Sequence, residues 1–162
     1  MAGKELTFSE DEFIVSKTDT KGRITYGNDL FVKMSGYSEE ELLGKPHNIL
    51  RHPQMPAVIF EYLWKNIQQK KEVFAYVINQ TKEKDFYWVF AHVTASIDEH
   101  DTIIGYHSAR RSPKKASLEF IKPLYKKLLI AEKSGGLESS RKVLQTLLKE
   151  KGVSYEEFIF SF

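Results

Sequence analysis

The sequence predicts an α+β protein: one five-stranded antiparallel sheet with short helices on one face, followed by a helical C-terminal tail. Segments rich in β-branched and aromatic residues alternate their side chains as strands do, and they lie at 13–18, 23–26, 73–80, 85–96 and 102–111. Helical patterns occur only between the second and third of these segments and after the last one. That order favours helices packed on a single antiparallel sheet over alternating βα units.

The first half of the chain carries clear start and stop signals. Asp19-Thr20-Lys21-Gly22 is typical of the turn between two hairpin strands. Asn28 is expected to cap a short helix that Gly36 ends, and Ser38 with Glu41 forms a capping box for the next helix. A longer amphipathic helix is predicted over 55–69.

The predicted strand 85–96 is apolar on both faces, which indicates that other elements cover both. One face carries Phe86, Trp88, Phe90 and His92, and the other Tyr87, Val89, Ala91 and Val93. After Pro113 the pattern becomes helical, with a predicted break at Ser134-Gly135-Gly136 and a stop near Gly152. Ser154 and Glu157 form a further capping box.

The composition excludes several classes of function. The chain has 162 residues, with 24 basic and 22 acidic side chains and no cysteine, so disulfides, thiolate metal sites and cysteine nucleophiles are excluded. It has no Gly-rich phosphate loop and none of the common hydrolase motifs, so we expect a protein that is not an enzyme. No basic block points to nucleic acid, and no signal peptide or long apolar run points to membrane insertion. A cytoplasmic location is therefore expected.

Two motifs carry a resemblance to a known family. The run from Asn28 to Ser38 fits N-x-x-F-x-x-x-x-G-Y-S, which is typical of PAS domains, and the run from His47 to Pro56 fits H-N-x-x-R-H-P-x-M-P. The second motif is narrower, and it resembles the PAS domains of aerotaxis receptors. Phe86-Tyr87-Trp88-Val89 and Ile104-Gly105-Tyr106 match later strands of the same family. The resemblance implies a PAS sensor domain at 8–115 and a helical tail at 116–162 for partner or dimer contacts.

The resemblance further implies a redox sensor for energy taxis that binds FAD. It would be a single-domain form that signals to a separate membrane chemoreceptor, and a homodimer is plausible for such domains. Arg51 and His52 precede the predicted long helix, whose free N-terminal amides suit the phosphates of the cofactor. The residues expected at the cofactor are Asn28, Asn48, Arg51, His52, Trp64, Phe74, Tyr76 and Trp88.

Two alternatives remain open from the sequence. A haem could replace the flavin, with His52, His92 or His107 as axial ligand. The second alternative is an adaptor that binds no cofactor and works through protein contacts. It is supported by Gln54 and Val73, which depart from the pattern of the flavin-binding relatives. Structural roles also compete with ligand binding: Asn28 as a helix cap, Arg51 in an ion pair with Glu41 or Glu61, and the tryptophans as core residues.

Overall fold

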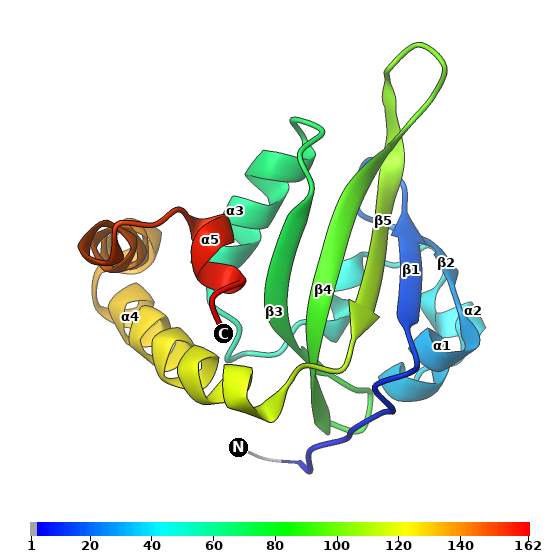
Figure 1. Cartoon of the computed structure of the whole chain (residues 1–162). Coiled ribbons are helices and arrows are strands. Elements are labelled where there is room, and N and C mark those ends of the chain that lie inside the picture. The colour runs from blue at the N-terminus through cyan, green and yellow to red at the C-terminus, as the bar shows by residue number, and fades with distance from the viewer. Residues whose placement is uncertain (1–2) are drawn as a thin grey trace.

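A five-stranded antiparallel sheet in the order β2-β1-β5-β4-β3 forms the centre of the protein (Figure 1). The computed structural model describes residues 3–162. The strands are β1 (Ile14–Thr18), β2 (Ile24–Gly27), β3 (Val73–Gln80), β4 (Phe86–Ile97) and β5 (Ile103–Arg111). The predicted α+β class, the number of strands and their approximate positions are confirmed.

Four short helical elements connect β2 to β3: α1 (Asp29–Ser35), α2 (Glu39–Leu42), the 3-10 helix η1 (His47–Leu50) and α3 (Ala57–Ile67). The predicted caps are present. The Asn28 side chain accepts a hydrogen bond from the Phe31 amide, Gly36 ends α1 with φ of 75°, and Ser38 and Glu41 form the capping box. The helix predicted at 55–69 starts two residues later, because the extended backbone of Pro56 precedes it, and it ends two residues earlier, at Ile67.

The tail forms α4 (Lys115–Lys151) and α5 (Tyr155–Ile159). α4 is in fact two helices, since Gly136 interrupts it with φ of 72° and ψ of −168°, as the Ser134-Gly135-Gly136 break predicted. Gly152 ends α4 in the left-handed conformation, and Ser154 with Glu157 caps α5. No helix within residues 3–162 is both long enough and apolar enough to cross a membrane.

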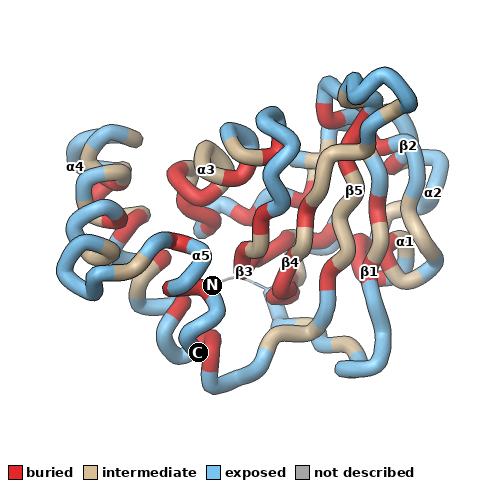
Figure 2. The backbone as a smooth tube through the Cα atoms, turned by 45° about the horizontal axis from the view of Figure 1, so that its top comes forward, coloured by how far each residue is buried: buried red, intermediate tan, exposed pale blue. Residues whose placement is uncertain are grey.

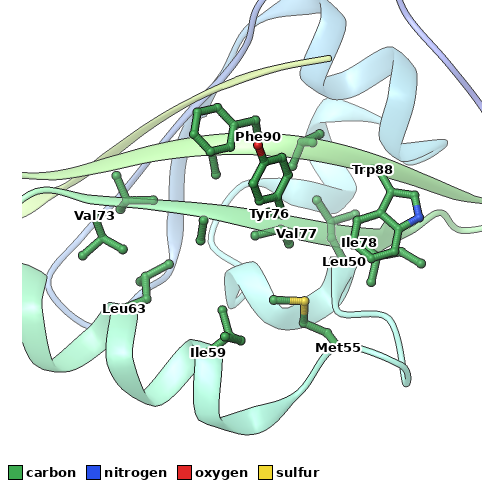
Figure 3. Close-up of a cluster of buried hydrophobic side chains, with 14 of the residues drawn as sticks. Leu50, Met55, Ile59, Leu63, Val73, Tyr76, Val77, Ile78, Trp88 and Phe90 are labelled. Carbon is green, nitrogen blue, oxygen red and sulfur yellow. The ribbon is translucent and has the colours of Figure 1, made fainter. Parts of the chain in front are cut away.

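Both faces of β3 and of the first half of β4 are buried, as the apolar faces of β4 predicted (Figure 2). On the inner face, Ile59 and Leu63 of α3 reach toward Val73 and Val77 of β3 (Figure 3). The outer face carries Tyr76, Trp88 and Phe90 and is covered by the tail, where the Tyr125 hydroxyl donates to the Tyr76 carbonyl. At β3 and β4 the sheet is therefore the middle layer between α3 and the tail.

The tail packs along β3, the strand at one edge of the sheet (Figure 1). α5 contacts β3, and the Tyr62 ring of α3 lies 4.1 Å from that of Tyr155 in α5. Leu118, Ile121, Tyr125 and Leu144 of α4 belong to the same hydrophobic core as the sheet. An open edge strand invites pairing with other chains, and the tail covers this one.

Candidate functional site

A cavity of about 360 Å³ lies between the inner face of the sheet and the helices α3 and η1. This volume is at the lower end of the roughly 300–1,000 Å³ typical of ligand pockets. Apolar side chains of α3, β3 and β4 form much of its lining, among them Leu63, Ile67, Val77, Ala91 and Val93. Polar groups gather at two places, one buried and one at the exposed mouth.

Arg110 dominates the buried group of polar side chains. It lies on β5 with 3% of its surface exposed, and its Nη2 donates to Ser16 Oγ of β1 at 2.6 Å. Its Nη1 is 3.2 Å from His47 Nε2 of η1, and Ser16 Oγ is 2.9 Å from the same nitrogen. In the pairing of β1 with β5, Ser16 lies opposite Ser108, so it is a diagonal neighbour of Arg110 on the same face of the sheet, and η1 adds His47.

The hydrogen bonds fix the protonation of His47. A guanidinium only donates, so Nε2 of His47 must accept, and the ring is the neutral tautomer with its proton on Nδ1. Burial, followed by the charge of Arg110, lowers the pKa of His47 to about 3. Burial also lowers the pKa of Arg110 to about 10, which leaves it charged at neutral pH. The buried end of the cavity therefore holds a positive charge beside neutral partners.

The mouth of the cavity is formed by Asn48, Arg51 and Trp64, all predicted at the cofactor. The Arg51 guanidinium lies over the Phe60 ring at 4.7 Å. Glu41 pairs with Lys82 and Glu61 with Arg141, so neither carboxylate engages Arg51 in the way the competing surface interpretation required. Trp64 of α3 meets Tyr106 of β5 edge-on at 5.3 Å.

Phe74, Tyr76 and Trp88 do not line the cavity, and their predicted role as its walls is corrected. Their positions in β3 and β4 alternate with those of the lining residues, which places their rings on the outer face beneath the tail. Phe74 contacts Phe160 at 4.8 Å, and Trp88 lies 5.9 Å from Tyr125. These aromatic rings anchor the tail.

Asn28 and His52 also lie outside the cavity. The Asn28 Oδ1 accepts from the amides of Phe31 and Val15, and its Nδ2 donates to the Phe13 carbonyl, so the side chain caps α1 and holds β1. The buried His52 accepts from the Gln54 amide at 3.0 Å. Both side chains have structural roles here.

The three histidines considered for a haem are poorly placed for that role. His52 is engaged as described, and the alternation of the strands puts the His92 and His107 side chains on the outer face. His92 stacks on Phe74 at 4.2 Å, and His107, although it borders the cavity, lies beside Lys17 in the ladder. Within residues 3–162 no group of three or more His, Asp or Glu residues could hold a metal ion.

The N-terminus of α3 does not present free amides to a ligand, which corrects a second expectation. The Glu132 carboxylate of α4 accepts from the Ala57 amide at 3.0 Å and from the Val58 amide at 3.2 Å. Ser140 also donates to Glu132 at 2.8 Å. An acidic side chain of the tail therefore occupies the place where a cofactor phosphate was expected.

The sequence interpretation missed most of the polar residues that border the cavity, among them Ser16, His47, Asn79 and Arg110. His47 stands first in the H-N-x-x-R-H-P motif, so the motif itself could have indicated it. Arg110 lies on the inward face of β5 together with Tyr106 and Ser108. A charged residue on the buried face of a strand could have indicated a functional site from the sequence. Asn79 lies at the end of β3, where its backbone forms an isolated bridge with Arg51.

The fold and the cavity beneath its sheet define a sensor-type domain, and the chain belongs to the PAS family: the family model described as "PAS fold" matches residues 12–108. Among individual proteins, the chain is 38% identical over 120 residues to the aerotaxis receptor of Escherichia coli strain K12. This match covers 74% of the chain and 24% of the receptor. It is also 28% identical over 97 residues to a nitrogen fixation regulatory protein of Klebsiella pneumoniae, covering 60% of the chain and 20% of that protein.

Solved structures agree on the fold. The dark structure of the blue-light photoreceptor Aureochrome1 LOV superposes with a TM-score of 0.61 at 17% identity, covering 66% of this chain and 80% of that one. A light-oxygen-voltage domain studied with a flavin analogue superposes with a TM-score of 0.59 at 19% identity, and the match covers 71% of this chain and 87% of that domain. The chain thus shares its architecture with these domains, and it spans about a quarter of the length of the aerotaxis receptor.

Proposed function

We propose that this chain is a flavin-binding PAS sensor for redox or energy state, with FAD as its cofactor. The observation that supports this most directly is the pair of arginines at the two polar ends of one largely apolar cavity. Arg110 lies at the buried end and Arg51 at the mouth, and neither forms an ion pair with a carboxylate within residues 3–162. The 38% identity to an aerotaxis receptor adds a second, independent support.

The cavity residues fit the parts of a flavin. Ser16, Asn79 and Arg110 offer the donors and acceptors that the edge of a flavin ring requires, and the aliphatic lining suits its faces. Arg51 at the mouth suits the phosphates, since guanidinium groups bind phosphate with two parallel hydrogen bonds. When bound, the flavin would supply the electron exchange, and the protein would supply orientation and electrostatics.

Helix α3 is positioned to pass a change in the cavity to the tail. Leu63, Trp64 and Ile67 line the cavity from this helix. At the same time, Arg141 of α4 binds Glu61 of α3 through two hydrogen bonds of 2.6 and 2.8 Å. A displacement of α3 would therefore act on α4, and we propose that the contacts between these two helices are the element that switches.

We further propose that the signal passes from the tail to a membrane chemoreceptor on a separate chain. The support is the likeness to an aerotaxis receptor together with the position of the tail on the outside of the sheet. A homodimer, a cytoplasmic location and the absence of enzyme activity stay predictions of the sequence. The haem alternative is less well supported, because the candidate histidines lie outside the cavity or face away from it.

An absorption spectrum of the protein purified without denaturation tests the proposed cofactor. We expect flavin bands, and FAD in the supernatant after heat release. A Soret band would instead favour haem. A colourless protein that also takes up no added FAD would overturn the flavin proposal and leave a cofactor-free PAS adaptor.

A further inference from the structure

The buried guanidinium of Arg110 lacks a counter-charge. No carboxylate in the described part of the chain forms an ion pair with it, and its Nε is buried without a hydrogen-bond partner. Its hydrogen-bonding neighbours are Ser16 of β1 and His47 of η1, and the Phe31 ring of α1 lies under the guanidinium at 5.1 Å. The buried hydroxyl of Tyr87 on β4 lies close enough to interact with the charge of Arg110 but forms no hydrogen bond with it. Burying a charge without an opposite charge costs free energy that a purely structural residue would have to recover elsewhere.

The neutral partners hold Arg110 in place without neutralising it. Ser16 and His47 hydrogen-bond to each other as well as to Arg110, so they fix the direction of the guanidinium. The Phe31 ring and the Tyr87 hydroxyl near Arg110 are neutral as well. Because Arg110 and both partners border the cavity, a negative charge close to the guanidinium would come from the occupant of the cavity.

We infer that Arg110 is the positioning residue that makes this cavity selective for a ligand which carries, or acquires on reduction, negative charge at its buried edge. The inference rests on the proposed function and deepens it. A flavin ring that takes up more electrons than protons becomes negatively charged, and a fixed cation in a low-dielectric site stabilises that form more than the oxidised one. The protein therefore holds the reduced cofactor more tightly than the oxidised cofactor.

Redox titration of the reconstituted full chain tests this. We compare the original protein with Arg110→Gln, which removes the charge, and Arg110→Lys, which keeps it. Arg110→Gln is expected to bind reduced FAD at least tenfold more weakly while its affinity for oxidised FAD changes much less. This lowers the midpoint potential of the bound cofactor by about 30 mV or more for a two-electron couple. Arg110→Lys is expected to keep most of the preference. Equal losses for both redox forms in Arg110→Gln would overturn the inference.

A second measurement does not depend on the flavin. In the cofactor-free protein, Arg110→Met replaces the unpaired charge by an apolar side chain of similar length, and Ser16 and His47 keep their mutual hydrogen bond. The melting temperature is expected to stay the same or rise, because an uncompensated charge is removed. A fall of several degrees would show that Arg110 serves the fold and would overturn the inference. Failure of the original protein to bind any flavin would instead refute the proposed function. The inference about Arg110 would then be judged on the melting temperatures of Arg110→Met and the original protein.

Discussion

At the scale of single residues, the group beside Arg110 makes His47 a histidine that resists protonation. Its Nε2 faces Arg110 Nη1 and Ser16 Oγ, so a proton on this nitrogen would point at a cation. Burial and the Arg110 charge lower its pKa to about 3 from an ordinary value of 6.5. Between these two values the unfolded chain binds a proton at this position and the folded protein does not, so stability rises with pH there.

We therefore predict that His47→Gln flattens the pH dependence of stability between about pH 5 and 6.5, because glutamine accepts the same hydrogen bonds and does not titrate. The original protein should lose stability as pH falls below about 6.5, with a contribution from His47 of up to about 1.4 kcal/mol per pH unit. Urea unfolding of both proteins across this pH range measures the free energy of unfolding. Burial also lowers the pKa of His52 and His107, so only the difference between the two proteins reports on His47. If the free energy of unfolding changed with pH by the same slope in both proteins, His47 would be protonated in the folded protein as readily as in the unfolded chain.

Arg51 allows a second prediction at this scale. If its guanidinium binds the phosphates at the mouth of the cavity, Arg51→Gln weakens FAD binding roughly tenfold or more, since charge-assisted hydrogen bonds are lost. Riboflavin, which has the same ring and no phosphate, should bind both proteins about equally. Fluorescence titration with the two ligands makes the comparison. A parallel loss for riboflavin would place Arg51 at the ring instead.

At the scale of elements, the junction of α4 with α3 is the feature that local sequence did not reveal. Glu132 caps the N-terminus of α3, and Arg141 binds Glu61 further along the same helix. The two carboxylate contacts join the helix that lines the cavity to the tail at two points. A displacement of α3 therefore either carries α4 with it or stretches these contacts.

Glu132→Ala is predicted to loosen this junction. Loss of a helix cap costs about 1 kcal/mol, and amide hydrogen exchange should speed up at Ala57, Val58 and in the second half of α4. Glu138→Ala is the matched control, since Glu138 lies in α4 just after the Gly136 break and its ion pair with Lys142, at 3.7 Å, is exposed. If both variants exchange alike, the cap does not hold the tail.

At the scale of the whole molecule, the tail and the sheet share one hydrophobic core. Removing the tail would uncover the outer face with Phe74, Tyr76 and Trp88, so a truncated chain is a poor test of where a partner binds. Variants on the exposed side of α4, where Ile130 is 60% exposed, are better suited to that question.

The two tryptophans lie on opposite faces of the sheet and can report on the two halves separately. Trp64 lies at the mouth of the cavity, and Trp88 lies beneath α4. In the single-tryptophan variants Trp88→Phe and Trp64→Phe, urea unfolding followed by fluorescence should give coincident transitions, because one shared core unfolds as a unit. An earlier transition reported by Trp88 alone would mean that the tail detaches before the sheet unfolds.

Much of the fold was predictable because its signals are local. A cap such as Ser38 with Glu41, or a break such as Gly136, depends on residues a few positions apart, and the alternation in β4 depends on neighbours. The motif around Arg51 and Asn48 contains two residues that border the cavity, and their role at a cofactor stays a prediction. In contrast, alternation shows that a strand has two faces without showing which face meets the cavity, which is why Phe74, Tyr76 and Trp88 were assigned to the wrong one.

The sequence by itself determined the class of fold, the order and ends of most elements, and the family, since these follow from periodicity, capping and contiguous motifs. The tertiary structure decided which residues form the site. His47 and Arg110 are 63 positions apart, and only the pairing of β1 with β5 and the placing of η1 bring them together with Ser16. It also decided that Glu132 takes the helix terminus expected for a cofactor phosphate. Such contacts depend on how the layers pack in space, and no local pattern of residues records that.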